Sequence, residues 1–535
     1  MGRGRTHRRR GGCVSTRLIR GVQVVLALAA ALGGGNVFAT TPVELDREVD
    51  ALVERYHLPG LAVGVIEDGE IVYTRTVGET VEGTGDPIAP ATLFKIASNT
   101  KAMTASVLAR LVDAGELQWE DPVVKHLPGF RMHDPWVTRE MQVRDLLIHN
   151  SGLREGAGDL MLWPEPNDYD RGDIIAGLAH LKPQRSFRSG YAYDNLLYVV
   201  AGEVAAAAGG ASYEALVRRE VFEPLGLTGC RVGAFDLESA GSVAQPHSHR
   251  DGANVVVNRD DSRVPAITSA AAGGIRCGLA DMLKWAQTWL APDPSQKAWL
   301  SDTQRAALWA SHTPLPISQR DRDWNGTRFR AYGYGWRLAD IDGEWSVSHT
   351  GTLSGMYSVL HLLPDRRSGF VVLINGSGDR ARTVINQVLV KHFTRPDESH
   401  TVERYANLLE RQPVQDGTNV SKPDVSVRRP ATGEELRHWL GTWRDPWFGE
   451  IRLCSEGDTV RFAAAKSPML AGVVMESAGR YLVDWDRDSV DAEAWLFPRG
   501  DGEQGRRLEM AKVDPEADFS YDYEDLSFVP AGGCD

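Results

Sequence analysis

The chain has 535 residues, which is room for roughly two or three domains with large cores. Hydrophobic residues make up 42% of it and charged residues 24%, which are the proportions of an ordinary globular protein and exclude a disordered, collagen-like or coiled-coil chain. The formal net charge is -13, from 72 acidic and 59 basic residues. This charge argues against nucleic acid as a partner, because phosphate binding needs a basic surface.

Residues 1–39 have the order of a secretory signal peptide. Seven arginines and no acidic residue lie within 1–20, an apolar run covers 24–32, and Val37-Phe38-Ala39 resembles a small-residue cleavage site. The apolar run is too short to cross a bilayer, which takes about 20 residues. We therefore predict an exported bacterial protein, periplasmic or secreted, with no stable membrane insertion after cleavage. The alternative is an uncleaved N-terminal anchor.

The segment 43–395 opens with a predicted β-hairpin. Two β-rich runs, 60–66 and 71–77, flank the turn sequence Asp68-Gly69. Apolar residues then recur at helical spacing over 98–113 and predict a helix.

A second helix is predicted over 196–208, where a glycine pair follows. Two more β-rich runs, 357–363 and 370–374, flank a polar turn and predict a late hairpin. An early hairpin, a helical middle and a late hairpin indicate one α+β domain over 43–395, whose sheet takes strands from both ends of the segment.

The chain changes character after residue 395. Residues 396–432 are polar and contain several prolines after a helix-like piece, which is typical of a linker. Residues 433–533 show only short strand patterns separated by turn sequences, and these predict a small β-barrel or sandwich. The predicted strands cover 450–453, 459–462, 481–485, 494–497 and 507–510.

Four cysteines remain beyond the predicted signal peptide: Cys230, Cys277, Cys454 and Cys534. Export permits disulfides, and four cysteines allow three pairings, of which a bond between the two late ones would staple the C-terminal region. Free buried cysteines are the alternative. Neither the cysteine spacing nor the pair His247-Ser248-His249, which lacks a nearby third ligand, predicts a metal site.

The segment Ser98-Asn99-Thr100-Lys101 is the strongest catalytic candidate, because H-E-x-x-H and G-x-S-x-G patterns do not occur in the sequence. It opens a predicted helix, so Ser98 and Lys101 share one face about a turn apart. A serine hydroxyl needs a neighbouring base to become a nucleophile, and a desolvated lysine can act as that base. The alternative is a serine near a helix start followed by a solvated lysine.

Two further segments carry groups that such chemistry uses. Tyr193-Asp194-Asn195 directly precedes the second predicted helix, which places a phenol and an amide at a helix start. The ordinary alternative is a buried tyrosine and an N-cap asparagine. His349-Thr350-Gly351-Thr352 follows a β-like run, and Gly351 would let a substrate backbone approach an edge strand. Its alternative is a turn between strands.

In this order, these segments resemble the serine β-lactamase and penicillin-binding-protein superfamily, in its class C-like branch of esterases, carboxypeptidases and D-aminopeptidases. The resemblance covers most of 55–395. It consists of six elements, at 59–63, 93–101, 143–153, 191–195, 272–275 and 334–336. Residues 433–533 more weakly resemble the lipocalin-like barrel often appended to this branch. The implied fold is α+β, with an antiparallel sheet flanked by helices and an all-helical lobe, followed by a small β-barrel.

The resemblance implies roles for individual residues. Ser98 would be the acyl-accepting nucleophile, with Lys101 and Tyr193 as coupled bases, and the order in which they take the proton stays open. Asn195 would bind the substrate amide. The backbone N–H groups of Ser98 and Thr352 would form the oxyanion hole.

The third family element departs from the common pattern. Many members have K-T-G where this chain has His349-Thr350-Gly351, followed by Thr352. A lysine supplies a permanent cation for a substrate carboxylate, whereas histidine is mostly neutral at pH 7. The departure argues against strong β-lactamase activity and leaves carboxylate recognition open.

We therefore expect an exported serine hydrolase that forms an acyl-enzyme on a small peptide, amide or ester, as a D-aminopeptidase, carboxypeptidase or esterase does, without a metal or organic cofactor. Two alternatives remain: a β-lactamase, and a catalytically silent protein that binds penicillin or another ligand. The oligomeric state, the substrate and the role of the barrel cannot be predicted from the sequence.

Overall fold

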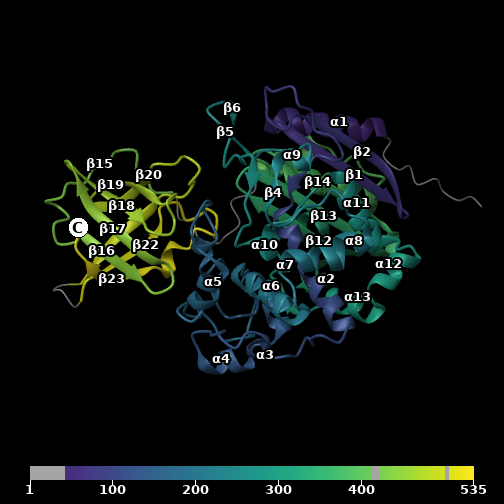
Figure 1. Cartoon of the computed structure of the whole chain (residues 1–535). Coiled ribbons are helices and arrows are strands. Elements are labelled where there is room, and N and C mark those ends of the chain that lie inside the picture. The colour runs from purple at the N-terminus through teal and green to yellow at the C-terminus, as the bar shows by residue number, and fades with distance from the viewer. Residues whose placement is uncertain (1–41, 412–421, 501–504, 535) are drawn as a thin grey trace, which may run out of the picture. The chain divides into compact units, whose positions relative to one another are not determined.

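The computed structural model describes residues 42–411, 422–500 and 505–534, so the predicted signal peptide lies outside the described residues. The first part of the described chain is built on an eight-stranded antiparallel sheet (Figure 1). In spatial order its strands are β2 (Glu70–Gly78), β1 (Gly60–Glu67), β14 (Ser368–Ile374), β13 (Met356–Leu363), β12 (Glu344–Leu353), β11 (Arg337–Ile341), β10 (Arg330–Tyr332) and β9 (Thr313–Pro314). The early and late hairpins are confirmed, and β1 pairs directly with β14.

Both faces of the sheet are covered, because successive side chains of a strand point to opposite faces and those of β1 and β14 are buried on both. In the pairing of β1 with β14, Leu61, Val63 and Val65 share one hydrophobic cluster with α1 (Pro42–Tyr56), α15 (Asp379–Thr394) and α16 (Val402–Arg411). The opposite face packs against α11 (Leu279–Leu290). A Cβ on Gly64 of β1 would lie 2.6 Å from Leu283 Cδ1, so glycine is needed for this close approach.

A helical lobe fills the middle of the chain, as expected. Its helices are α2 (Thr100–Asp113), α3 (Val123–His126), α4 (Pro135–Glu140), α5 (Arg171–Gly177), α6 (Leu196–Gly209), α7 (Tyr213–Val217), α8 (Glu223–Leu225), α10 (Ala270–Gly273), α12 (Pro294–Trp299) and α13 (Asp302–Leu308). Single turns lie at 97–99, 143–147, 159–161, 218–222, 364–366 and 523–525. Short pieces complete the domain: β3 (Phe94–Lys95), β4 (Phe235–Asp236), β5 (His247–Arg250), β6 (Ala253–Val256), β7 (Arg263–Val264), β8 (Arg276–Cys277), α9 (Leu237–Ala240) and α14 (Gln319–Asn325).

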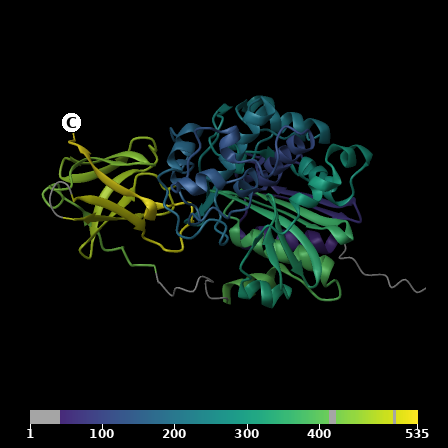
Figure 2. The same ribbon diagram turned by 90° about the horizontal axis from the view of Figure 1, so that it is seen from below.

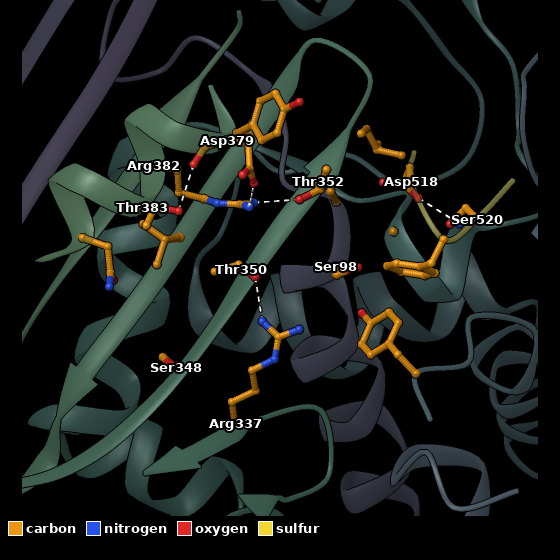
Figure 3. A pocket seen from close by; sticks show the side chains of 18 of the residues that line it. Ser98, Arg337, Ser348, Thr350, Thr352, Asp379, Arg382, Thr383, Asp518 and Ser520 are labelled. Carbon is orange, nitrogen blue, oxygen red and sulfur yellow. Dashed lines mark hydrogen bonds and ion pairs between the residues drawn. The ribbon is translucent and has the colours of Figure 1, made fainter. Parts of the chain in front are cut away.

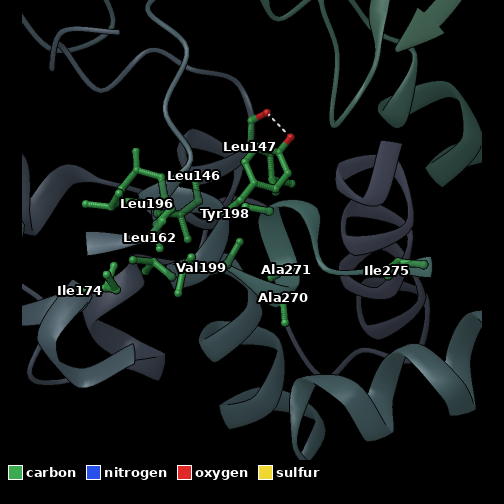
Figure 4. Close-up of a cluster of buried hydrophobic side chains, with 14 of the residues drawn as sticks. Leu146, Leu147, Leu162, Ile174, Leu196, Tyr198, Val199, Ala270, Ala271 and Ile275 are labelled. Atoms are coloured by element: carbon green, nitrogen blue, oxygen red, sulfur yellow. Dashed lines mark hydrogen bonds between the residues drawn. The ribbon is translucent and has the colours of Figure 1, made fainter. Parts of the chain in front are cut away.

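Helix α6 is the centre of the lobe. Leu196, Tyr198 and Val199 are buried on it, and they lie among apolar side chains from several other elements (Figure 4). The Tyr198 hydroxyl donates a hydrogen bond to the carbonyl oxygen of Leu147 at 2.7 Å, so the one polar group of this aromatic side chain is satisfied. The described residues contain no single helix that is long and apolar enough to span a membrane, although α6 and the bent continuation 213–225 pass that test together.

The predicted linker contains a docked helix. Helix α16 buries Val402 and Tyr405 in the same cluster as α1 and α15, and the backbone N–H of Val402 donates to Glu48 at 2.7 Å. By its packing this helix belongs to the helical layer of the first domain. The sequence of this segment resembles a linker because it is strongly polar, and it is polar because only one narrow face of the helix is buried.

The C-terminal part is a closed eight-stranded antiparallel barrel (Figure 2). Its strands are β16 (Gly441–Asp445), β17 (Gly449–Glu456), β18 (Thr459–Ala464), β19 (Ala471–Ser477), β20 (Arg480–Trp485), β21 (Ala494–Arg499), β22 (Arg507–Lys512) and β23 (Ser527–Gly532), and β15 (Arg429–Pro430) lies outside β19. Five of these strands correspond to the predicted ones. The three missed strands are β16, β19 and β23, and β23 contains Pro530 and Gly532, which are turn signals by sequence.

Two disulfides join the four cysteines. Cys454 of β17 bonds to Cys534 beyond β23, which is the predicted staple of the C-terminal region. Cys230 bonds to Cys277 of β8 in the first domain. Since β8 pairs with β3 at Cys277 and Phe94, this second disulfide holds a strand beside the segment that leads to Ser98.

Candidate active site

Ser98 lies in a single 3₁₀ turn, Ala97–Asn99, directly before α2. The predicted helix thus begins two residues later than expected. Ala97 has a backbone φ of +49°, which is in the left-handed region and costs a non-glycine residue about 1–3 kcal/mol. The chain therefore makes a strained corner that turns the Ser98 side chain toward a cavity.

Lys101 is fully buried, and its ammonium group contacts three acceptors. Nζ lies 3.1 Å from Ser98 Oγ, 2.8 Å from Asn195 Oδ1 and 2.9 Å from the carbonyl oxygen of Ala272. Burial lowers the pKa of the Lys101 amine to about 7, and the Asp159 carboxyl acts in the opposite direction. Near neutral pH a large fraction of the amine is therefore uncharged and can accept the proton of Ser98.

Tyr193 is buried beside Lys101, whose Nζ lies 4.8 Å from the centre of its ring. Burial raises the pKa of the phenol well above its ordinary value, while Arg337 and the Ser98 hydroxyl lower it less strongly. Apart from this interaction with Ser98, the Tyr193 hydroxyl has no hydrogen-bond partner among the described residues. It is therefore a neutral group whose proton is not engaged elsewhere.

Asn195 differs from its expected role. Its Oδ1 accepts from Lys101 and its Nδ2 donates to Asp159 Oδ2 at 2.8 Å, so its amide is turned into the protein although it lines the cavity. Nor does its side chain cap α6. The backbone N–H of Leu197 donates instead to Asp194 Oδ1 at 3.2 Å.

The stretch 143–153 supports the Tyr193 segment from behind. The carbonyl oxygen of His149 accepts a hydrogen bond from the backbone N–H of Ala192 at 2.9 Å. The ring Nδ1 of His149 accepts one from the backbone N–H of Asp194 at 3.0 Å. The His149 and Tyr193 ring centres are 4.3 Å apart. Burial lowers the pKa of His149 well below its ordinary value, so the neutral ring serves as an acceptor and packing surface.

The predicted element His349-Thr350-Gly351-Thr352 lies in β12, and its residues point alternately to the two faces of the strand. Thr350 and Thr352 line the cavity. His349 is fully buried on the other side, where its Nε2 contacts the Tyr332 hydroxyl at 2.8 Å and burial lowers its pKa well below the ordinary value. The structure thus keeps His349 away from the position predicted for it, because alternate residues of a strand point to opposite faces.

Gly351 also has a different function from the predicted one. A Cβ at this position would lie 2.2 Å from the carbonyl oxygen of Ile96 and 3.0 Å from Ala97 Cβ. The absent side chain lets the Ala97–Asn99 turn, rather than a substrate backbone, approach β12.

A positive charge enters the cavity from the neighbouring strand. Arg337 of β11 is paired in register with Ser348, and its Nη1 donates to Thr350 Oγ1 at 2.7 Å. None of the ion pairs within the described residues involves Arg337, and a guanidinium does not deprotonate in proteins. We did not predict this residue, although it directly follows the element 334–336.

The cavity has a volume of about 820 Å³, which is in the usual range for a small-molecule site (Figure 3). One wall consists of β12 and α15, from which Arg382 donates to Thr352 Oγ1 at 2.7 Å. Asp518 and Ser520 of the barrel lie on the opposite wall, and Phe519 also lines the cavity. We did not predict from the sequence that the barrel reaches the site.

The histidine pair noted in the sequence has structural partners. His247 Nδ1 contacts the carbonyl oxygen of Asn375 at 2.9 Å, and its Nε2 accepts from the backbone N–H of Glu82 at 3.2 Å. His249 Nδ1 contacts Asn254 Oδ1 at 3.0 Å. Within 42–411, 422–500 and 505–534, His, Cys, Asp and Glu form no group that could hold a metal ion.

Comparison with known proteins identifies the first domain. The family model described as Beta-lactamase matches residues 45–392. An unguisins hydrolase of Aspergillus campestris is 24% identical over 76% of this chain and 76% of its own length. Penicillin-binding protein 4 of Amycolatopsis lactamdurans is 28% identical over 61% of this chain and 83% of its own.

The octameric penicillin-binding protein homologue from Pyrococcus abyssi superposes with a TM-score of 0.57, at 19% identity, over 89% of this chain and 99% of that one. This likeness supports the fold, with the barrel included. The family match extends over well more than half of the chain and includes the Ser98 turn, the Tyr193 segment and β12. The chain therefore belongs to the beta-lactamase family of serine hydrolases.

Proposed function

We propose that the protein is an exported hydrolase that forms an acyl-enzyme on Ser98 and cleaves small peptide, amide or ester substrates. The observation that carries this proposal is the 3.1 Å contact between Ser98 Oγ and the buried amine of Lys101. Relatives that are named hydrolase and penicillin-binding protein support the same class of chemistry.

In the acylation step, Ser98 Oγ bonds to the substrate carbonyl carbon while its proton moves to Lys101 Nζ. The charge that develops on the carbonyl oxygen is stabilised by the backbone N–H groups of Ser98 and Thr352. The pKa directions support Lys101 as the first base, because the amine is easily neutral whereas the Tyr193 phenol resists ionisation.

The scissile bond then breaks, and the leaving amine or alcohol takes a proton from the Tyr193 hydroxyl, which Lys101 reprotonates. Water attacks the resulting ester, gives its proton to Lys101, and releases the acid product. Ser98 recovers its proton as its bond to the acyl group breaks, so the cycle consumes one water and needs no cofactor.

We further propose that the preferred substrates end in a free carboxylate, as those of a carboxypeptidase do. Arg337 supplies the permanent cation that His349 cannot supply, and it lies beside the Thr350 hydroxyl on the cavity wall. A guanidinium and a hydroxyl side by side match the two oxygens of a carboxylate.

The nucleophile is tested on the chain beginning at residue 40. A fluorescent penicillin and a fluorophosphonate should each add one covalent label, found by intact mass and peptide mapping on Ser98, and Ser98→Ala should lose it. Ser354→Ala is the matched control, since Ser354 lines the same cavity. Label that persists in Ser98→Ala would show that another residue is the nucleophile.

Carboxylate recognition is tested with two D-amino-acid peptides that differ only in a free or amidated C-terminus. Arg337→Met should lower kcat/KM for the free acid about 10- to 100-fold and leave the amide within about twofold, because a hydrogen bond to a charged group is lost only with the acid. Arg337→Lys should recover part of the loss. An equal loss on both peptides would contradict this specificity.

Two alternatives are measured in the same assays. Rapid turnover of nitrocefin would favour a β-lactamase. Labelling of Ser98 without turnover of any p-nitrophenyl ester, amide or peptide would favour a silent penicillin-binding protein. Export is supported by the two disulfides, which persist in oxidising compartments, and N-terminal sequencing of the protein recovered outside the cytoplasm tests cleavage after residue 39.

A further inference from the structure

The barrel contributes a side chain to the hydrogen bonds that hold the catalytic lysine. Ser520, in the segment between β22 and β23, donates from Oγ to Asp159 Oδ2 at 2.8 Å. Asp159 is fully buried and opens the single turn 159–161 of the helical lobe. The same carboxylate oxygen accepts from Asn195 Nδ2 at 2.8 Å, and Asn195 Oδ1 accepts from Lys101 Nζ at 2.8 Å.

This chain of contacts fixes the orientation of the Asn195 amide. Asp159 Oδ2 accepts from the Ser520 hydroxyl, so it presents an acceptor to Asn195 as well, and the NH₂ group of Asn195 faces Asp159. Its carbonyl oxygen therefore faces Lys101, where an acceptor is needed. With the amide reversed, an NH₂ group would oppose the lysine amine, and a buried donor would be left unpaired.

Other contacts anchor the barrel segment at the same place. Asp522 Oδ2 accepts from the backbone N–H of Gly158 at 2.7 Å, and Arg154 pairs with Glu524 at 2.8 Å. A Cβ on Gly156 would lie 2.6 Å from the carbonyl oxygen of Phe519, so the two backbones touch. Ser520 is thus held over Asp159 by neighbours on both sides.

We propose that Asp159 and Ser520 are positioning residues for catalysis, which act through Asn195 to hold Lys101 against Ser98. The barrel then completes the active site in addition to forming one wall of its cavity. This inference rests on the proposed function of Ser98 and Lys101. Asp159 itself does not line the cavity, so its effect belongs in the chemical step and not in substrate binding.

The test compares substitutions that keep or remove the acceptor at Asp159, in the full chain from residue 40. Asp159→Asn keeps an oxygen that can accept from both Asn195 and Ser520, and we expect kcat within about fivefold of the parent. Asp159→Leu has a similar size and no acceptor, and we expect kcat to fall about 100-fold or more with KM nearly unchanged. Equal losses in both variants would overturn the proposal.

Ser520 is tested in the same way. Ser520→Ala should lower kcat about three- to tenfold, and Ser520→Thr, which keeps the hydroxyl, should restore it. Ser489→Ala is the matched control, because Ser489 also lies in the barrel and lines the same cavity. Parent-like kcat in Ser520→Ala would refute the contribution of the barrel.

Two measurements separate this inference from its foundations. Thermal unfolding of each variant identifies a loss that arises from misfolding, and the Asp159→Asn and Ser520 variants still decide the question if Asp159→Leu does not fold. The rate of covalent labelling of Ser98 provides the second measurement. If Ser98→Ala keeps activity, the proposed function fails; if labelling requires Ser98 but is insensitive to Asp159 and Ser520, only the positioning inference fails.

Discussion

The Ala97–Asn99 turn and the barrel segment around Ser520 line the same cavity, but they reach it in different ways. Ser98 and Lys101 are three residues apart, and a single turn before α2 brings them together. Ser520 lies more than 400 residues further along the chain and reaches the helical lobe from the closed barrel. Local geometry therefore supplies the reacting groups, and long-range packing supplies their orientation.

This difference predicts which substitutions abolish chemistry and which weaken it. A group that takes the proton of Ser98 cannot be replaced by its neighbours, whereas a positioning contact is one of several that hold the same side chain. The predictions below test that division, beginning with the largest effect.

Lys101→Met removes the amine but keeps a long side chain of similar volume. We expect kcat/KM to fall about 1,000-fold, the middle of the range for loss of a general base, because the Lys101 amine is the base that contacts Ser98 Oγ. Thermal unfolding should show only a small change in stability, since replacing a buried amine by an apolar group is favourable, whereas Asn195 Oδ1 and the Ala272 carbonyl oxygen lose their donor.

Lys95→Met is the control, because Lys95 of β3 lines the same cavity and its Nζ lies 3.8 Å from Asp260 Oδ1. We expect it to retain most of the activity on a small ester. If Lys101→Met kept parent activity, or if Lys95→Met lost as much, the local pair would not be the source of the chemistry.

The pH dependence of kcat/KM sharpens the assignment of the base. Lys101 must be neutral to accept a proton, and its pKa is lowered to about 7 by burial. The rate should therefore reach its plateau above pH 7 and fall about tenfold per unit below it, to roughly 1% of the plateau at pH 5. A profile that is flat from pH 5 to pH 8 would exclude Lys101 as the base.

Gly351→Ala tests whether the close packing of β12 supports the Ala97–Asn99 turn. The added methyl group would press on the carbonyl oxygen of Ile96, so we expect a loss of about 1–3 kcal/mol in the free energy of unfolding and about tenfold in kcat. Gly129→Ala, where the added Cβ meets no atom within 4 Å, is the control in urea unfolding and in the assay. Unchanged kcat in Gly351→Ala would show that the turn does not depend on β12.

The sequence predicted the parts of the fold that depend on neighbouring residues. The two hairpins follow from alternating apolar residues around turn sequences, and α2 and α6 follow from helical spacing. Strand β23 was missed because its proline and glycine resemble a turn, although Trp443 of the adjacent strand β16 is paired with Pro530 there. Pairing within a closed barrel decides this strand, and local propensity does not.

The sequence predicted only part of the site. Ser98, Lys101, Tyr193 and Asn195 are brought together as expected, whereas His349 is buried on the far face of β12. Which face a residue takes depends on strand register, which a single sequence does not reveal when both faces are covered. Arg337 was missed because its function follows from the lateral pairing of β11 with β12.

The disulfide between Cys230 and Cys277 has a practical consequence for heterologous production. It fixes β8, whose partner strand β3 leads directly into the strained corner before Ser98. Protein made in a reducing cytosol would carry free thiols at this point, and the corner would lose a covalent brace. Enzyme refolded or expressed under oxidising conditions is therefore the appropriate material for judging catalytic power.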